Sequence, residues 1–347
     1  MLMGILPASH PAPPMGRTHL ESFMAHDIEI VDGIASAFYH RLPAWHGLGV
    51  VLDYAPTGAD ACEVAHLDRP LSKRPILVPS YTHPGHFLAD PDNCAIVRDD
   101  DERVFGHVGK SYEIHQTTQC FDFADSLVGH GITYESAGSL DGGRRPWLLA
   151  RLQDGVIEPV PGDPSQAYLL ITTDHTGHGA TTAKLVNQRV VCANTLRVAL
   201  GESGGEIKIR HTSVLEAKVE QAQAVLKTAR IATARTEAVL KRLAALPCNA
   251  GQWESFLGAL IPAESTRSEN IRAVLTGIFA ELPDRECLPA IRDTRYAALQ
   301  AVTAYTTWAR GTRSVDGKSA DEQRLTSSWF GDSAALNSRA LALLAAA

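Results

Sequence analysis

The sequence lacks several features that would assign a protein class directly. No apolar run approaches the roughly 20 residues that a membrane-spanning helix needs, and none of the six cysteines belongs to a CxxC pair. Widely separated thiols are typical of a reducing cytoplasm and disfavour both a disulfide framework and a structural zinc site. We therefore expect a cytoplasmic protein that does not associate with membranes and needs no cofactor.

Aromatic residues are scarce, at 6% of the chain, which weakens any function that depends on stacking bases against side chains. A phosphate-binding loop is also missing. Residues 106–111, GHVGKS, resemble the end of such a loop, but its pattern requires glycine where this chain has Val104. Residues 111–115 then have the pattern of a strand where a helix should begin. Lys110 could still contact a phosphate as a point charge.

The 347 residues divide into three predicted parts. Residues 1–23 contain the proline-rich run HPAPP and no continuous apolar segment, so we predict a disordered extension that is not a signal peptide. Residues 24–211 are rich in strand patterns and predict an α+β domain. Residues 212–347 have helical periodicity and predict an all-helical region packed on that domain.

Hairpin signals dominate the predicted α+β domain. Residues 168–172 and 180–186 have strand patterns and flank DHTGHG, whose aspartate and glycines suit a tight loop. A polar turn and an Asp-Gly-Gly turn predict two more hairpins, which join residues 94–97 to 103–108 and residues 132–140 to 145–152. We expect a mostly antiparallel sheet built from hairpins, with flanking helices at residues 58–68 and 117–131 and another that begins at Leu196.

Residues 213–245 contain neither glycine nor proline and predict one long helix. Its apolar and small residues recur at a four–three spacing that resembles a coiled-coil seam. The seam can pack inside the chain, or it can bind a second copy and give a homo-oligomer. Prolines punctuate four further predicted helices, at residues 251–260, 268–281, 291–310 and 333–344. The residues of the seam are Leu215, Val219, Ala222, Leu226, Ala229, Thr233, Thr236, Leu240 and Leu243.

Chemically capable side chains gather in and after the DHTGHG loop. Cys192 with Asn194 and either His175 or His211 has the residue types of a thiol nucleophile, an orienting group and a base. The structural interpretation is a buried small hydrophobe at Cys192, a helix cap at Asn194 and a satisfied histidine at His211. An enzyme of the thiol hydrolase type is therefore one hypothesis that the sequence leaves open.

The same loop offers a second kind of site. Asp174, His175 and His178 lie within five residues of one another, and carboxylate and imidazole groups are ordinary zinc ligands. If the loop holds a metal, the three side chains should converge on one point. A metal-dependent enzyme is thus an alternative form of the catalytic hypothesis.

Charge is distributed unevenly along the chain. Residues 184–242 carry eleven basic and five acidic side chains, a net charge of +6 in a chain of net charge −7. A solvated helix face explains much of this asymmetry, but a surface that contacts phosphates is the sharper interpretation. The basic residues that we single out for nucleic-acid binding are Lys110, Arg144, Arg145, Arg189, Arg197, Lys208 and Arg210.

Several ordered motifs give the chain a family resemblance: WHGLG, VGKSYEIHQ, GSLDGGRRPW, DHTGHG, RVVCANTL, IRHT, QAVTAY and the closing ALNSRALALL. From about Met24 onward the chain resembles the phage/plasmid-like uncharacterised family (domain of unknown function 932). This resemblance implies an association with phages, plasmids and transferred DNA. The hairpin–helix–hairpin core is also loosely similar to single-strand annealing proteins, by analogy of fold only. We therefore expect nucleic-acid binding, most simply of single-stranded DNA during recombination or replication, with an enzyme as the alternative.

Overall fold

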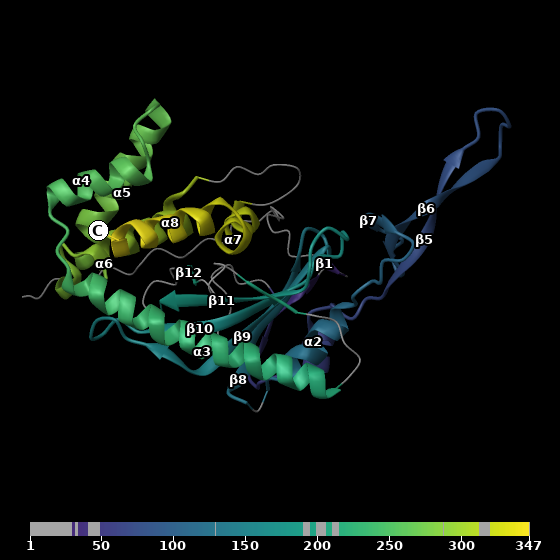
Figure 1. Cartoon of the computed structure of the whole chain (residues 1–347), viewed down its shortest axis with the longest axis horizontal. Helices are drawn as coiled ribbons and strands as arrows, with labels where there is room; N and C mark the ends of the chain where they lie inside the picture. Colours follow the sequence, from purple (N-terminus) through teal and green to yellow (C-terminus); the bar gives the residue numbers. More distant parts are fainter. Residues whose placement is uncertain are drawn as a thin grey trace, which may run out of the picture.

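The computed structural model describes the chain in nine stretches: residues 30–31, 34–40, 49–128, 130–189, 195–198, 206–209, 215–286, 288–311 and 320–346. They form a central sheet, a group of helices packed against it and a β-arm that projects away from both (Figure 1). The predicted α+β fold, with a mostly antiparallel sheet and a helical C-terminal region, is confirmed. The extension predicted at residues 1–23 lies outside the described residues.

The central sheet runs in the order β12-β11-β10-β9-β8-β3-β4, with β13 also pairing with β11. Its neighbouring strands are antiparallel except β3 and β4, which are parallel. A separate two-stranded sheet joins β1 (Ile30–Val31) and β2 (Ile34–Ala35). The strands of the central sheet are β3 (Ala37–His40), β4 (Val50–Leu52), β8 (Ile132–Leu140), β9 (Arg145–Ile157), β10 (Ser165–Thr172), β11 (Thr182–Arg189), β12 (Thr195–Val198) and β13 (Ile207–Lys208).

The predicted hairpins are present. β10 and β11 pair from Ser165 opposite Arg189 to Thr172 opposite Thr182, so the DHTGHG loop closes this hairpin. β8 and β9 are joined through Asp141, Gly142 and Gly143, which all have positive φ (55°, 60° and 95°). Asp and Gly tolerate this conformation best, which is why Asp-Gly-Gly predicted the turn.

Two local predictions are wrong. The helix predicted from Leu196 is instead strand β12, which pairs antiparallel with β11 and places Leu196 opposite Asn187. A cap-like Asn-Thr pair suggested a helix, but β-branched and apolar residues beside an open sheet edge gain more from pairing with it. Residues 111–115 do not form a strand either; the chain leaves the arm there and turns toward α2.

The β-arm consists of β5 (Leu71–Pro79), β6 (Phe87–Arg98) and β7 (Val104–Gly109), in the order β5-β6-β7. β7 pairs only with residues 93–97 of β6, so the arm has three strands at its base and two at its tip. Figure 1 shows the two-stranded tip extending far from the body. The base is held tightly, because a Cβ on Gly106 would lie 2.1 Å from the Thr176 carbonyl oxygen of the β10–β11 loop.

Helices are present within or close to the ranges predicted at residues 58–68, 117–131, 213–245, 251–260, 268–281, 291–310 and 333–344, whereas α7 (Ala320–Phe330) was not predicted. Among the described residues, no helix combines the length and the apolar composition that crossing a bilayer would require. Pro283, expected to end a helix, lies inside the last turn of α5. The helices are α1 (Gly58–Val64), α2 (Thr117–Asp125), α3 (Leu215–Ala245), α4 (Ala250–Leu260), α5 (Thr266–Arg285), α6 (Arg295–Ala304), α7 (Ala320–Phe330) and α8 (Asp332–Ala346), with a 3-10 turn at Pro289–Ile291 and a π turn at Tyr305–Ala309.

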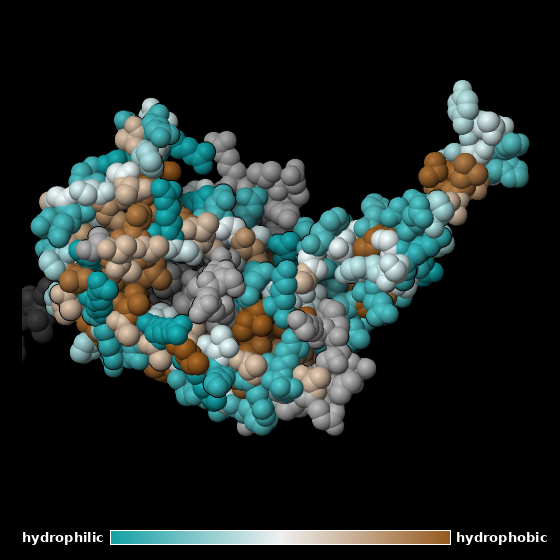
Figure 2. All heavy atoms as spheres, viewed as in Figure 1, coloured by the Kyte–Doolittle hydropathy of each residue, from teal (hydrophilic) through white to brown (hydrophobic). Residues whose placement is uncertain are grey.

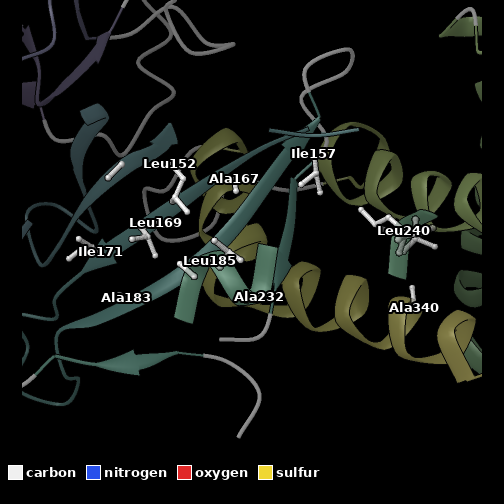
Figure 3. Packing of buried hydrophobic residues seen from close by; sticks show 14 of the residues in the cluster. Leu152, Ile157, Ala167, Leu169, Ile171, Ala183, Leu185, Ala232, Leu240 and Ala340 are labelled. Atoms are coloured by element: carbon white, nitrogen blue, oxygen red, sulfur yellow. The ribbon is translucent and has the colours of Figure 1, made fainter. Parts of the chain in front are cut away.

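Both faces of the sheet are covered, as the continuous burial of β10 requires. On one face, Leu169 and Leu185 belong to a core that also contains Ala232 and Leu240 of α3 (Figure 3). On the other face, Trp147 packs edge-on against Trp329 of α7, with ring centroids 5.0 Å apart. The coiled-coil-like seam of α3 is buried within the chain from Ala222 to Leu243, so its apolar residues stabilise the sheet–helix interface.

Candidate functional site

His175 lies where the β10–β11 loop meets the base of the arm. The side chain is only 5% exposed, its Nε2 lies 2.9 Å from the Thr117 hydroxyl, and its ring stacks on Phe105 of β7. Its backbone N–H donates to the Arg144 carbonyl at 2.9 Å. Burial lowers the pKa of His175 to about 4, so the ring is neutral at physiological pH. These contacts join the loop, α2 and the arm.

The cavity beside His175 is too small to hold a substrate. Its volume is about 20 Å³, between Arg98, Phe105, Thr117 and the imidazole, which is room for about one water molecule. His175 therefore acts in this structure as a buried neutral hydrogen-bonding group, and it has no open space in which to serve as a general base.

A second polar cluster was not predicted from the sequence. Cys120 Sγ lies 3.4 Å from His115 Nδ1, and the same nitrogen lies 2.7 Å from the Thr181 hydroxyl, which donates to Thr173. A cysteine beside a histidine is the pair that thiol enzymes use. Burial, however, raises the pKa of the Cys120 thiol to about 12, so the sulfur stays protonated and is a poor nucleophile.

Asp174, His175 and His178 are each engaged separately. Asp174 Oδ1 accepts hydrogen bonds from the Thr176 backbone N–H at 2.8 Å and from its hydroxyl at 2.6 Å. His178 is exposed, with Nδ1 3.3 Å from the Thr176 hydroxyl, while His175 points into the core. Within the described stretches, no group of three or more His, Cys, Asp or Glu side chains is placed to hold a metal ion.

The two arginines of the β8–β9 turn bend back onto the protein. Arg144 donates from Nε to the Phe105 carbonyl at 3.2 Å and from Nη2 to the Val104 carbonyl at 3.1 Å. Arg145 Nη2 lies 3.7 Å from Asp174 Oδ2, and its guanidinium stacks over Phe330 of α7. Both were singled out from the sequence for nucleic-acid binding, and these contacts hold Arg144 at the base of the arm and Arg145 against α7.

The other predicted residues fall into two groups. Lys110 and Lys208 are exposed, at the end of β7 and in β13 respectively. The backbones of Arg189 and Arg197 lie in β11 and β12. The structure does not describe the side chains of those two arginines. It also does not describe Arg210 or the thiol-site candidates Cys192, Asn194 and His211.

The outward side of α3 carries a row of cations that sequence reasoning counted but did not single out. Lys227, Arg235 and Arg242 are exposed, and within the described part of the chain they form no ion pair. At 3.6 residues per turn they lie within about 80° of one another around the helix and span about 22 Å along it. Their spacing of eight and seven residues, opposite the apolar seam, is the signal that could have found them.

Two neighbouring cations on α3 are already paired. Arg230 Nε donates to Asp154 Oδ2 at 2.8 Å, and its Nη2 donates to the His130 carbonyl at 3.1 Å. Lys241 Nζ pairs with Glu237 at 2.7 Å. Among the α3 cations whose side chains the structure describes, Lys227, Arg235 and Arg242 are therefore the three best placed to contact an anionic partner. We call these three residues the α3 ridge.

Together these features define an α+β protein with a projecting β-arm, a buried polar junction at the base of that arm and a cationic ridge on its longest helix. The chain belongs to the family described as Domain of unknown function (DUF932), whose sequence model matches residues 104–329. The matched segment begins at β7 and reaches into α7, which confirms membership of the domain of unknown function 932 family over these residues. No curated protein and no solved structure matches the chain.

Proposed function

We propose that this protein binds nucleic acid, most simply single-stranded DNA, through the phosphate backbone. The observation that supports the proposal is the α3 ridge of Lys227, Arg235 and Arg242, a row of exposed cations on a rigid helix. One strand of a duplex carries a phosphate for about every 3.4 Å of helix axis, so several phosphates fall within a ridge about 22 Å long. Lysine and arginine at such positions bind phosphates without reading the base sequence.

The α3 ridge favours the electrostatic form of binding. Neutralising phosphates releases counterions, which gives affinity that is sensitive to salt and tolerant of sequence. Stacking of bases contributes little, because aromatic residues make up only 6% of the chain. Association with phages or plasmids and a role in strand annealing are compatible with this mode of binding and stay part of the proposal.

The enzyme alternative has less support. His175 is buried beside a cavity of about 20 Å³, and the loop residues proposed as metal ligands are engaged separately. The Cys120–His115 pair holds a thiol whose pKa burial raises to about 12. We therefore propose binding as the function.

The proposal is tested with charge-matched variants and a fluorescent single-stranded oligonucleotide. The ridge variant carries Lys227→Gln, Arg235→Gln and Arg242→Gln. The control variant removes the same charge elsewhere, at the exposed residues Arg103, Arg267 and Arg285. By fluorescence anisotropy at about 50 mM salt, where electrostatic binding is strong, the wild type and the control variant bind and the ridge variant binds about tenfold or more weakly.

Two outcomes would count against this function. If the wild type shows no binding at that salt concentration, the protein is not an electrostatic nucleic-acid binder. If the ridge and control variants weaken binding equally, the surface is somewhere other than α3. Thermal melting of all three proteins checks that any loss of binding does not come from unfolding.

A further inference from the structure

The tip of the β-arm exposes apolar side chains that a monomer in water would leave uncovered. Leu77 and Val78 of β5 are 55% and 53% exposed, and Phe87 and Leu88 of β6 are 62% and 60% exposed. Tyr81 in the connecting turn is 99% exposed. Figure 2 shows this group as a hydrophobic band near the end of the arm, away from the body. A contiguous apolar patch of this kind marks a surface that binds a partner.

Both faces of the tip are apolar, which distinguishes it from a simple surface ribbon. Phe87 lies opposite Pro79 on one face, and Leu88 lies opposite Val78 on the other. Because side chains alternate between faces along a strand, a two-stranded ribbon can bury neither set by itself. A partner that covers the tip must therefore contact both of its faces.

The edges of the tip argue against pairing with another strand. β5 contains Pro75 and Pro79, and β6 contains Pro91 near its start. Proline has no N–H to donate, and edge prolines are a common way to block strand addition. A partner must therefore contact the side chains of the tip and not its backbone.

A matching cavity lies in the helical region of the same chain. It has a volume of about 420 Å³ and is lined by α4, the start of α6 and the end of α8, including Phe256, Ala259 and Leu344. This size is within the range of about 300–1,000 Å³ that takes compact apolar ligands. Figure 1 places these helices at the opposite end of the molecule from the arm, so the tip cannot reach the cavity of its own chain.

The arm tip and the α4–α6–α8 cavity carry complementary charges. Residues 75–93 of the arm contain Asp90 and Asp92 and no lysine or arginine. Among the residues that the structure describes, the cavity is lined by Arg295 and by no Asp or Glu, and the exposed Arg339 donates to the carbonyl of Ala259 at its wall. An acidic apolar tip fits this cavity better than it fits nucleic acid or an anionic membrane, which would repel its carboxylates.

We propose that this chain self-associates head to tail, with the arm tip of one copy docked on the α4–α6–α8 cavity of the next, so that Phe87 enters the cavity and Leu88 packs at its rim. Because the two surfaces differ, the interface is heterologous, and repeated contacts give rings or chains. The tight packing of Gly106 against Thr176 fixes the base of the arm, so each copy presents its tip in a defined direction. This assembly needs no nucleic acid and is independent of the α3 ridge.

Analytical ultracentrifugation of the full chain without nucleic acid tests the proposal. The wild type should associate in a concentration-dependent way. A tip variant (Phe87→Glu and Leu88→Glu) and a cavity variant (Ser255→Trp, at an exposed position that lines the cavity) should each stay monomeric. The matched control Val156→Glu, at a 54% exposed apolar side chain on β9, should associate like the wild type.

Mixing the two monomeric variants gives the decisive readout. The tip variant keeps an intact cavity and the cavity variant keeps an intact tip, so an equimolar mixture should form one-to-one dimers that do not grow further. If the cavity variant alone associates like the wild type, the tips bind each other or another surface and the proposal is wrong. A wild type that stays monomeric at about 100 µM, well above the micromolar dissociation constant of a modest interface, would overturn it as well.

Discussion

The hydroxyl of Tyr296 in α6 donates to the Asp163 carboxylate at 2.7 Å, across 133 residues of sequence. Both side chains are completely buried. Asp163 lies in the connection before β10, so this bond ties the sheet to the helical region. A buried carboxylate needs its hydrogen-bond donors, because losing one leaves a desolvated charge poorly satisfied.

Replacing Tyr296 with phenylalanine should therefore lower the free energy of unfolding by about 1–3 kcal/mol. Urea denaturation followed by circular dichroism and by tryptophan fluorescence measures the loss. The circular dichroism and fluorescence signals should report the same single unfolding transition in the variant as in the wild type, because the sheet and the helices share one core. Two separate transitions in the wild type would contradict a shared core.

His175 predicts a specific dependence of stability on pH. An unfolded histidine binds its proton near pH 6.5, whereas burial lowers the pKa of folded His175 to about 4, with Asp174 and Arg98 as the charged neighbours. Between these values the unfolded chain binds more protons, so stability should decrease as the pH falls from about 6.5 to about 4. The contribution of His175 to that decrease is at most about 3 kcal/mol.

Urea unfolding at pH 7.5 and pH 5 separates this contribution from those of the other histidines. The His175→Gln variant should lose less stability than the wild type between the two pH values. The exposed residue His178 supplies the control. The His178→Gln variant should lose as much stability between the two pH values as the wild type does. Equal pH dependence in all three proteins would show that His175 does not titrate as its burial requires.

Cys120 should resist thiol reagents in the folded protein. Its pKa of about 12 leaves almost no thiolate near pH 8, and the sulfur is buried. Cys94 is partly exposed and should react first of these two. Peptide mapping after a short treatment with iodoacetamide measures both, and rapid labelling of Cys120 would revive the hypothesis of a reactive Cys–His pair.

Arg144 should stabilise the base of the arm and should not contribute to nucleic-acid binding. The Arg144→Gln change removes its hydrogen bonds to the Val104 and Phe105 carbonyls and should cost about 1–2 kcal/mol. Hydrogen exchange of β7 should become faster, while the affinity for an oligonucleotide stays unchanged. The exposed Arg103 supplies the control, and Arg103→Gln should leave exchange in β7 as in the wild type.

Local patterns predicted the hairpins because turn chemistry and side-chain alternation are written within a few residues, as at Asp141–Gly143 and in the DHTGHG loop. They failed where distant partners decide. Asn194 and Thr195 gave a cap signal for a helix from Leu196, but pairing with the open edge of β11 made this segment a strand. Arg144 was singled out as a candidate for nucleic-acid binding, but the carbonyls that it binds in the structure lie about 40 residues away in sequence.

The candidate site was harder to predict than the fold for the same reason. Cys120 meets Thr181 across 61 residues, and only the docking of α2 against the β10–β11 loop brings them together. The α3 ridge was readable in principle, since its residues share one helix face. It was missed because Lys227, Arg235 and Arg242 are separated in sequence by neutral residues, by Glu237 and by two cations, Arg230 and Lys241, that the structure pairs internally.

The salt dependence of single-stranded DNA binding tests the central claim most directly. For the wild type, the logarithm of the association constant should fall linearly with the logarithm of salt concentration, by about 0.7 for each phosphate contacted. Removing the three ridge cations should flatten that slope by about 2, while the Arg103, Arg267 and Arg285 control keeps it. A wild type whose binding does not depend on salt, or a ridge variant with an unchanged slope, would contradict binding through α3.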